Sequence, residues 1–248
     1  MKKVTKRLWA MLLALVMTVT MIPALGGLAF ADDAATISVF LTVSNKGALA
    51  TANDDSLMAV KPVQVADLDG NGSFTVDEAL VAAHAAYNQP DGYVVSAGQV
   101  KKFWGVETSN LLFFVNDVGL SNGVTEDTVQ DGDFVVASIN TDDELYSDYF
   151  TSFEDKNVEA LVGEQVTLNL FGRPGMSSGP DALVKNPVAG VDVKAIALDG
   201  TETALGKTDE SGNITFNCPA AGTYVITASG DRSRTQGPRL PSVEERGS

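Results

Sequence analysis

The chain has 248 residues and a mass of 26.0 kDa, and 44% of its residues are hydrophobic, which is enough for one or two domains with ordinary cores. Asp and Glu outnumber Lys and Arg by 32 to 17, and the formal net charge of -15 argues against nucleic-acid binding, which requires a basic face. One His and one Cys exclude an internal disulfide framework and any zinc site built from several such residues.

The first 31 residues have the composition of an export signal. Four basic residues precede an apolar run over 8–22, which is shorter than the roughly 20 residues of a membrane span. Ala29-Phe30-Ala31 forms a small-x-small cleavage site, so we predict a signal peptide over 1–31 and a mature chain that starts at Asp32. The lack of paired Cys favours a bacterial secreted protein, with the cell surface as a possible destination and no membrane span after cleavage.

The segment 36–141 has the pattern of a small α+β domain, a sheet with one helix. Val76, Leu80, Ala83, His84 and Tyr87 share one largely apolar helical face, which predicts a helix over 78–87. The strands that we expect, from alternating or continuous apolar runs, cover 37–43, 59–65, 111–115 and 134–139.

The rest of the chain divides into three parts. Residues 142–156 are acidic and predict an exposed linker. Residues 157–230 predict an all-β sandwich, because short apolar runs alternate with Gly, Pro, Asn and Asp turns. Residues 231–248 are rich in Arg and poor in apolar residues, which predicts a disordered tail.

One stretch, Asp67–Glu78, matches the calcium-loop pattern D-x-[DN]-x-[DN]-G-x5-E at every fixed position. Ca²⁺ binds about six to eight oxygen atoms in flexible geometry. The predicted ligands are the side chains of Asp67, Asp69 and Asn71, the backbone carbonyl of Ser73, Thr75 directly or through water, and both carboxylate oxygens of Glu78. Gly72 allows the sharp reversal of the loop, and Phe74 is expected to attach the loop to a core.

An alternative interpretation is an Asp- and Gly-rich turn whose carboxylates only cap the following helix. Repulsion argues against it, since the carboxylates at 67, 69, 77 and 78 would repel one another without a cation. The residues before the loop, 63–65, have a strand pattern instead of an entering helix, and sensor proteins usually pair two loops. These features favour a structural site of the extracellular type, with a dissociation constant of about 10⁻⁴ to 10⁻³ M for Ca²⁺.

The loop and its helix resemble the calcium loops of EF-hand and dockerin proteins. The motifs at 103–106, 112–117 and 129–136 resemble the small β-grasp domain found at the C-terminus of transcobalamin and in bacterial surface proteins, with Asp117 in place of the usual Gly. This resemblance implies a β-grasp fold over 36–141. It also implies an alternative function, the capture of a corrinoid-like small molecule, but it assigns no ligand-contacting residue.

The motifs at 189–193, 208–216 and 219–224 resemble bacterial Ig-like modules of the collagen-adhesin B type. Such modules are usually spacers, and some crosslink a Lys to an Asn in the last strand. Lys194 occupies a suitable strand, but the expected last strand after Thr227 is missing, which argues against the crosslink.

Other reactive residue types favour structural roles. His84 lies on the apolar helix face, so we expect it to be buried and hydrogen-bonded instead of acting as a base, and Cys218 is expected to be a buried small hydrophobe. Trp104 and the aromatics from Phe103 to Phe114 are expected in the core more than in a ligand groove. A polysaccharide hydrolase with paired catalytic carboxylates is the least favoured function, because the sequence singles out no carboxylate for a catalytic role.

The sequence therefore predicts a secreted, non-catalytic calcium-binding protein of the cell-surface or adhesion type. Its expected partners are the calcium ion and a cell-surface protein or glycan. Extracellular binding of a corrinoid-like ligand, with the calcium merely structural, is the alternative.

Overall fold

The computed structural model describes residues 35–142, 148–177 and 179–229, which form mostly β-strands and one α-helix. The predicted signal peptide (1–31) and the predicted tail (231–248) lie outside these residues. None of the helices within the described ranges is long and apolar enough to cross a membrane. The coarse α+β class agrees with the sequence prediction.

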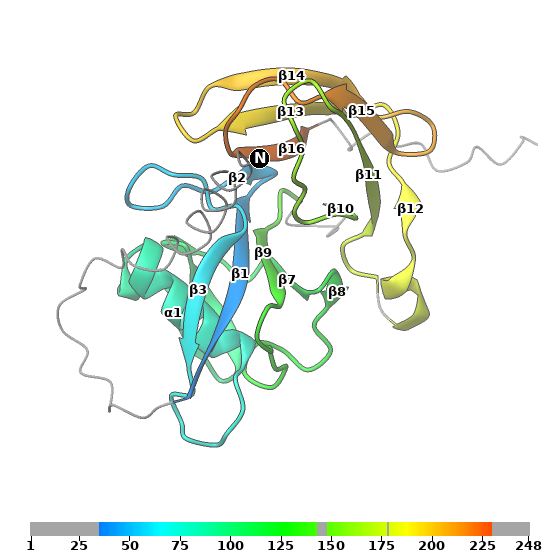
Figure 1. Cartoon of the computed structure of the whole chain (residues 1–248). Coiled ribbons are helices and arrows are strands. Elements are labelled where there is room, and N and C mark those ends of the chain that lie inside the picture. The colour runs from blue at the N-terminus through cyan, green and yellow to red at the C-terminus, as the bar shows by residue number, and fades with distance from the viewer. Residues whose placement is uncertain (1–34, 143–147, 178, 230–248) are drawn as a thin grey trace, which may run out of the picture. The chain divides into compact units, whose positions relative to one another are not determined.

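A six-stranded sheet forms the first part of the described chain. Its strands are β1 (Thr36–Asn45), β2 (Ala48–Leu49), β3 (Lys61–Ala66), β7 (Leu111–Val115), β8 (Val118–Gly119) and β9 (Phe134–Ile139). β1 runs antiparallel to β3 and parallel to β9, and β9 runs antiparallel to β7. The main strands therefore follow the order β3-β1-β9-β7 (Figure 1).

The helix α1 (Val76–Tyr87) packs on this sheet. Alternation along β1 buries Val39, Leu41 and Val43, and these side chains share one core with Leu80 and Ala83 of the helix. The predicted apolar helix face is therefore the packed face. The core fixes the start of α1, and with it the loop that joins β3 to the helix (Figure 1).

A small sheet between α1 and β7 was not predicted. It contains β4 (Val94–Ser96), β5 (Gln99–Phe103) and β6 (Val106–Glu107), and the short helix η1 (Pro90–Gly92) precedes it. Its strands have only two to five residues, too few for a clear alternation. Phe103 at the end of β5 is fully buried in the core, as expected for these aromatics.

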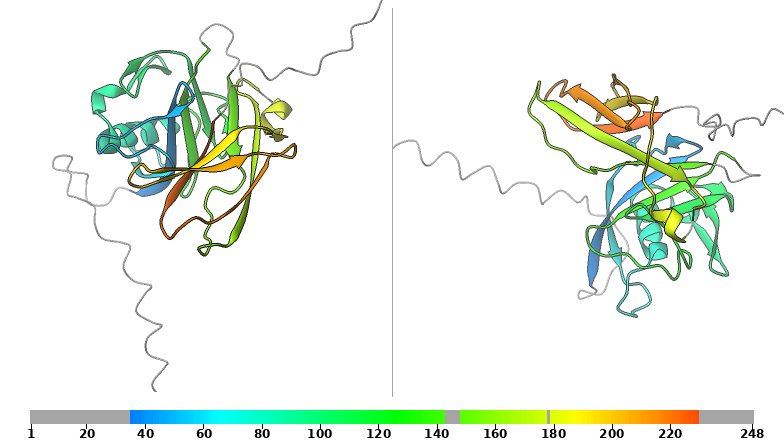
Figure 2. Two further views of the ribbon diagram at one scale, coloured as in Figure 1. Left: turned by 90° about the horizontal axis from the view of Figure 1, so that it is seen from above. Right: turned by 90° about the vertical axis from the view of Figure 1, so that its right-hand side faces the viewer.

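Two antiparallel sheets with sandwich character follow (Figure 2). The first contains β10 (Tyr149–Phe153), β11 (Gln165–Pro174), β12 (Asn186–Pro187) and β15 (Asn213–Asn217). The second contains β13 (Asp192–Ala197), β14 (Glu202–Lys207) and β16 (Tyr224–Ser229), and the short helix η2 (Gly179–Leu183) lies between β11 and β12. Leu168, Val193 and Ile214 join the two sheets in one core.

The strand β10 corrects the prediction of an exposed linker over 142–156. Its aromatic residues override the acidic composition, because Phe150 is buried against Phe114 of β7 and Phe171 of β11. The rings of Phe114 and Phe150 lie 4.0 Å apart between centroids. This part of the chain therefore contributes to a core.

Candidate metal centre

The candidate site lies in the connection between β3 and α1. β3 ends at Ala66 and α1 begins at Val76, so the calcium-loop pattern covers the whole connection and the first helical turn. A strand enters the loop, as predicted, in place of the entering helix of a helix-loop-helix unit. Phe74 packs against the main core, so the loop is attached to the fold from inside, also as predicted.

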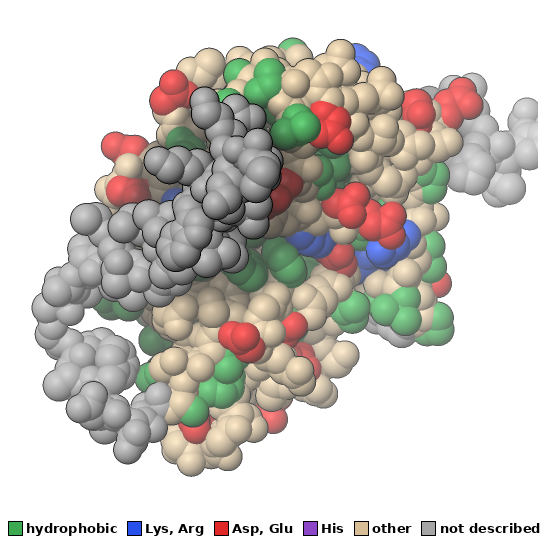
Figure 3. Space-filling model, in the orientation of Figure 1, with side chains coloured by type: hydrophobic (Ala, Val, Ile, Leu, Met, Phe, Trp, Pro, Cys, Tyr) green, Lys and Arg blue, Asp and Glu red, His purple; other side chains and the backbone are tan. Residues whose placement is uncertain are grey.

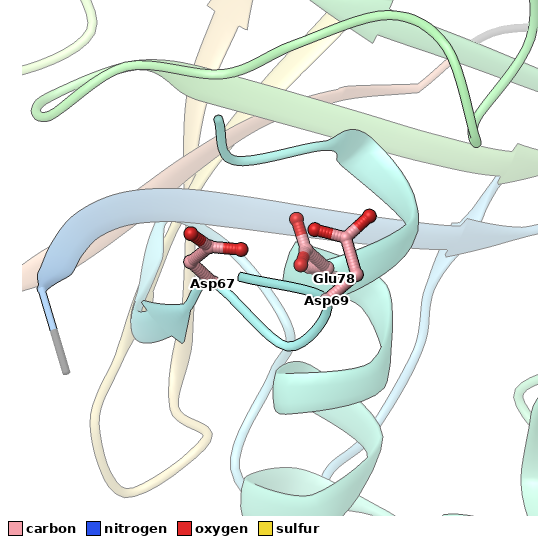
Figure 4. Close-up of side chains that lie close together, drawn as sticks. All are labelled: Asp67, Asp69 and Glu78. Carbon is pink, nitrogen blue, oxygen red and sulfur yellow. The ribbon is translucent and has the colours of Figure 1, made fainter. Parts of the chain in front are cut away.

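Three carboxylates converge in this connection. One oxygen atom from each of Asp67, Asp69 and Glu78 lies within 4.8 Å of the others. Figure 4 shows two of these side chains on the loop and Glu78 on the helix. Asp69 is exposed, Asp67 is half-buried and Glu78 is buried, so the group opens to solvent on one side.

Asp77 does not join this group, although the sequence analysis counted it among the mutually repelling carboxylates. Its Oδ1 accepts a hydrogen bond of 2.6 Å from the hydroxyl of Tyr93. Burial, together with this bond to Asp77, raises the pKa of Tyr93 far above its usual value. Asp77 therefore has a structural partner of its own.

Asp67 organises the tip of the loop. Its Oδ1 accepts from the backbone N–H groups of Gly70 at 2.8 Å and Asn71 at 3.2 Å, and its Oδ2 accepts from Gly72 at 2.8 Å. The Gly72 bond is the main reason why the pKa of Asp67 lies below its usual value. The Asp67 carboxylate is therefore ionised at neutral pH. The two glycines at the tip, Gly70 and Gly72, have φ of 72° and 84°, a region that other residues rarely adopt.

Glu78 has two roles in the same place. Its Oε1 accepts from the N–H of Leu68 at 2.6 Å, and its Oε2 accepts from the N–H of Thr75 at 2.7 Å and from its hydroxyl at 3.0 Å. Thr75 in turn accepts from the N–H of Glu78 at 3.2 Å, which completes a capping box. The helix-cap interpretation therefore holds for Thr75 and Glu78, and the capping carboxylate is also a member of the triad.

Asn71 and Ser73 lie beside the triad. The Nδ2 of Asn71 donates to Asp69 Oδ2 at 2.8 Å, and its Oδ1 accepts from the N–H of Ser73 at 2.7 Å. Ser73 thus joins the network through its N–H, whereas the sequence predicted a ligand role for its carbonyl oxygen. Of the six predicted ligands, the structure gathers the three carboxylates and places Asn71 and Thr75 next to them.

A second loop, which the sequence does not indicate, supports the start of α1 beside the site. The carbonyl oxygens of Asp127 and Val124 accept from the N–H groups of Val76 and Asp77 at the start of α1, at 2.9 and 2.8 Å. The carboxylate of Asp127 accepts from three consecutive N–H groups, those of residues 121–123. Asn122-Gly123 marks a turn in the sequence, but no local pattern indicates that this turn contacts the helix.

Other residues that the sequence analysis singled out have structural surroundings. His84 is buried and hydrogen-bonded, as predicted. Lys194 pairs on the surface with Glu202 at 2.5 Å, which does not support a role in a crosslink. Cys218 is half-buried, and not buried as expected, because it follows the end of β15.

A scan against protein-family models finds no match, and searches of curated proteins and of solved structures find no similar protein.

Proposed function

We propose that the chain is an exported bacterial calcium-binding protein without catalytic activity, in which the ion stabilises the β3–α1 loop. The observation that carries this proposal is the convergence of Asp67, Asp69 and Glu78 within 4.8 Å, on a loop with the complete spacing of the calcium pattern. We further propose that the protein acts at the cell surface, through contacts to a protein or a glycan.

The donor set suits Ca²⁺ better than other ions. Carboxylate oxygens, the amide oxygen of Asn71 and the hydroxyl of Thr75 are hard ligands, which do not favour zinc or copper. Mg²⁺ requires a tight octahedral shell and keeps several waters, whereas Ca²⁺ tolerates the irregular spacing of a loop. A divalent ion would also offset the repulsion between the three carboxylates.

We assign residues 36–141 to a β-grasp-like domain and residues 157–230 to an Ig-like module. The order β3-β1-β9-β7, the parallel pair β1 and β9, and the helix on the sheet support the first assignment. The turn after β7 supports it too, because Asn116 and Asp117 have φ of 48° and 67°, a backbone region that favours Asn, Asp and Gly in two-residue hairpin turns. The core shared by the two C-terminal sheets supports the second.

Calorimetry with added calcium and with chelator tests the proposal. Calcium should raise the melting temperature, because an ion that binds only the folded state stabilises it by mass action. Glu78→Gln and Asp67→Asn should each remove most of this shift. Glu126→Gln, which removes one negative charge from an exposed residue outside the triad, is the matched control and should keep it.

The quantity to compare is the shift caused by calcium within each variant, since Glu78→Gln also weakens the cap of α1. A melting temperature that is the same with calcium and with chelator in the unmodified chain would contradict the proposal.

A further inference from the structure

The calcium-type loop contains a peptide bond of unusual chemical character. Asn followed by Gly can cyclise spontaneously, because Gly has no Cβ to hinder its backbone nitrogen from reaching the amide carbon of the Asn side chain. The chain contains two such pairs, Asn71–Gly72 in the loop and Asn122–Gly123 beside the start of α1. Both Asn side chains are exposed, so sequence and exposure alone do not distinguish them.

The bonds that protect Asn71–Gly72 all come from the loop itself. The N–H of Gly72 donates to Asp67 at 2.8 Å, and the side chain of Asn71 is held by Asp69 and by the N–H of Ser73. Asn71, Gly72 and Ser73 are exposed, and a Cβ at Gly72 would meet no atom within 4 Å. Within the part of the chain that the structure describes, no residue outside 67–73 contributes a hydrogen bond to this protection.

The surroundings of Asn122–Gly123 are tied to the core. The N–H of Gly123 donates to Asp127 Oδ2 at 3.1 Å, and the side chain of Asn122 donates to Asp127 Oδ1 at 3.1 Å. Asp127 is attached through its backbone to Val76 at the start of α1, and the residue after Gly123, Val124, is buried. Opening this turn would therefore disturb the helix.

The two pairs differ further in the charge around them. Asp67 protects Gly72, but it is one of three carboxylates that converge within 4.8 Å, so without a cation repulsion favours opening of the loop. Opening frees the nitrogen of Gly72 and the side chain of Asn71 together. A cation held by the triad would oppose this opening.

We propose that Asn71 is a site of spontaneous deamidation, that calcium in the loop slows the reaction, and that Asn122 is protected by the fold. The calcium part rests on the proposed function; the difference between the two sites does not. The nitrogen of Gly72 forms a bond to Cγ of Asn71, the Cγ–Nδ2 bond breaks, and ammonia leaves with the proton from Gly72. Water then opens the cyclic imide to aspartate or isoaspartate.

The products have different consequences for the loop. Aspartate at position 71 places a further negative charge beside Asp67 and Asp69. Isoaspartate routes the main chain through the former side chain, which lengthens the loop between Asp69 and Gly72 and disturbs the ligand spacing of the pattern. The isoaspartate product therefore limits the lifetime of the site, whereas the aspartate product keeps an oxygen ligand that the pattern allows at position 71.

Peptide mass spectrometry of the full chain, incubated in mildly alkaline buffer, tests the proposal. With chelator, the deamidated form should accumulate several-fold faster at position 71 than at position 122. Calcium should lower the deamidation rate at position 71 several-fold and leave the rate at position 122 unchanged. In urea both sites should convert at similar rates, which shows that the folded structure causes the difference.

Equal rates at both sites in the folded protein with chelator, or a faster rate at position 122, would overturn the assignment of the labile site. Calcium titration calorimetry, run in parallel, separates the two claims. If calcium binds but does not slow deamidation at position 71, the proposed protection by calcium is wrong. If calcium does not bind, the proposed function fails, and the deamidation rates of the two sites with chelator still test whether Asn71 is the labile one.

Discussion

His84 is the single histidine of the chain, and its contacts fix its tautomer. Its Nδ1 lies 2.7 Å from the carbonyl oxygen of Leu80, which can only accept, so Nδ1 carries the proton. Its Nε2 accepts from the backbone N–H of Trp104 at 3.1 Å. The ring also stacks on Tyr93, with centroids 5.0 Å apart. Both nitrogens are therefore engaged, which removes His84 as a general base.

We predict that His84 stays neutral in the folded chain at pH values where a free histidine is protonated. Burial lowers its pKa below the usual 6.5, and the bond to Leu80 only partly opposes this effect. Nitrogen NMR of the imidazole should show Nδ1 protonated and Nε2 unprotonated at pH 6.5. Since the chain has one histidine, the signals need no assignment. A ring that titrates at its ordinary pKa would contradict the burial argument.

The same pKa shift predicts a pH dependence of stability. Because the pKa of His84 is lower in the folded state, the unfolded state binds more protons below about pH 6.5, and the contribution of His84 is fully present only above that pH. The free energy of unfolding in urea should therefore fall as the pH drops from 7.5 through 6.5. His84→Gln should show a shallower fall over this range, which separates the histidine from the carboxylates that titrate at lower pH.

At the scale of elements, the N-terminal cap of α1 and the candidate metal site share Glu78. Thr75 accepts from Glu78, and Glu78 accepts from Thr75. We predict that Thr75→Ala lowers the free energy of unfolding by about 1 kcal/mol, the usual cost of losing an N-cap side chain. Thr75→Ser, which keeps the hydroxyl, should lose much less. Urea denaturation with chelator measures both; equal losses in the two variants would show that the hydroxyl does not cap the helix.

The elements also show what the sequence can predict. Local patterns give the strands 111–115 and 134–139 with the bounds that the structure has, and the apolar face of α1. The candidate ligands follow from spacing, because the calcium pattern alone selects Asp67, Asp69 and Glu78, whose carboxylate oxygens converge in the structure. The contact of Asp127 with the start of α1 could not be predicted, because it joins residues about 50 positions apart.

The pairing of distant strands could not be predicted from local patterns either. β1 pairs with β9 from Phe40 and Phe134 onwards, although each strand shows only its own alternation in the sequence. The acidic residues of 142–156 hid β10, since composition averages over a segment whereas burial depends on single side chains such as Phe150. The hydrogen bond between Asp77 and Tyr93 could not be predicted for a related reason, because Tyr93 follows the helix.

At the scale of the whole molecule, three phenylalanines from β7, β10 and β11 form a cluster of their own, and Arg173 lies over two of the rings. Its guanidinium is 4.8 Å from the ring centre of Phe150 and 5.8 Å from that of Phe114. It also donates to the backbone oxygen of Asp117, and Lys156 pairs with the side chain of Asp117 at 2.8 Å. These contacts join the turn after β7 to β11.

We predict that Phe150→Ala lowers the free energy of unfolding by about 3 to 5 kcal/mol, the range for removing a buried aromatic ring. Val158→Ala, at a position that is 47% exposed, should change it by less than about 0.5 kcal/mol. Urea denaturation followed by tryptophan fluorescence compares the two. A small loss for Phe150→Ala would show that the cluster contributes little to stability.

The chain carries an excess of acidic residues, and Figure 3 shows Asp and Glu side chains spread over one face. A general negative charge attracts any cation weakly and is screened by salt, whereas a built site saturates. Binding at the loop therefore has to be distinguished from this background by its dependence on the triad carboxylates.

Equilibrium dialysis with radioactive calcium, in physiological salt, makes this distinction. We predict saturable binding of about one ion per chain, with a dissociation constant of about 10⁻⁴ to 10⁻³ M. Asp67→Asn and Glu78→Gln should each weaken this binding strongly, and Glu126→Gln should leave it unchanged. Binding that does not saturate, or that all three variants reduce equally, would show that the Asp67–Glu78 loop is a helix cap without an ion.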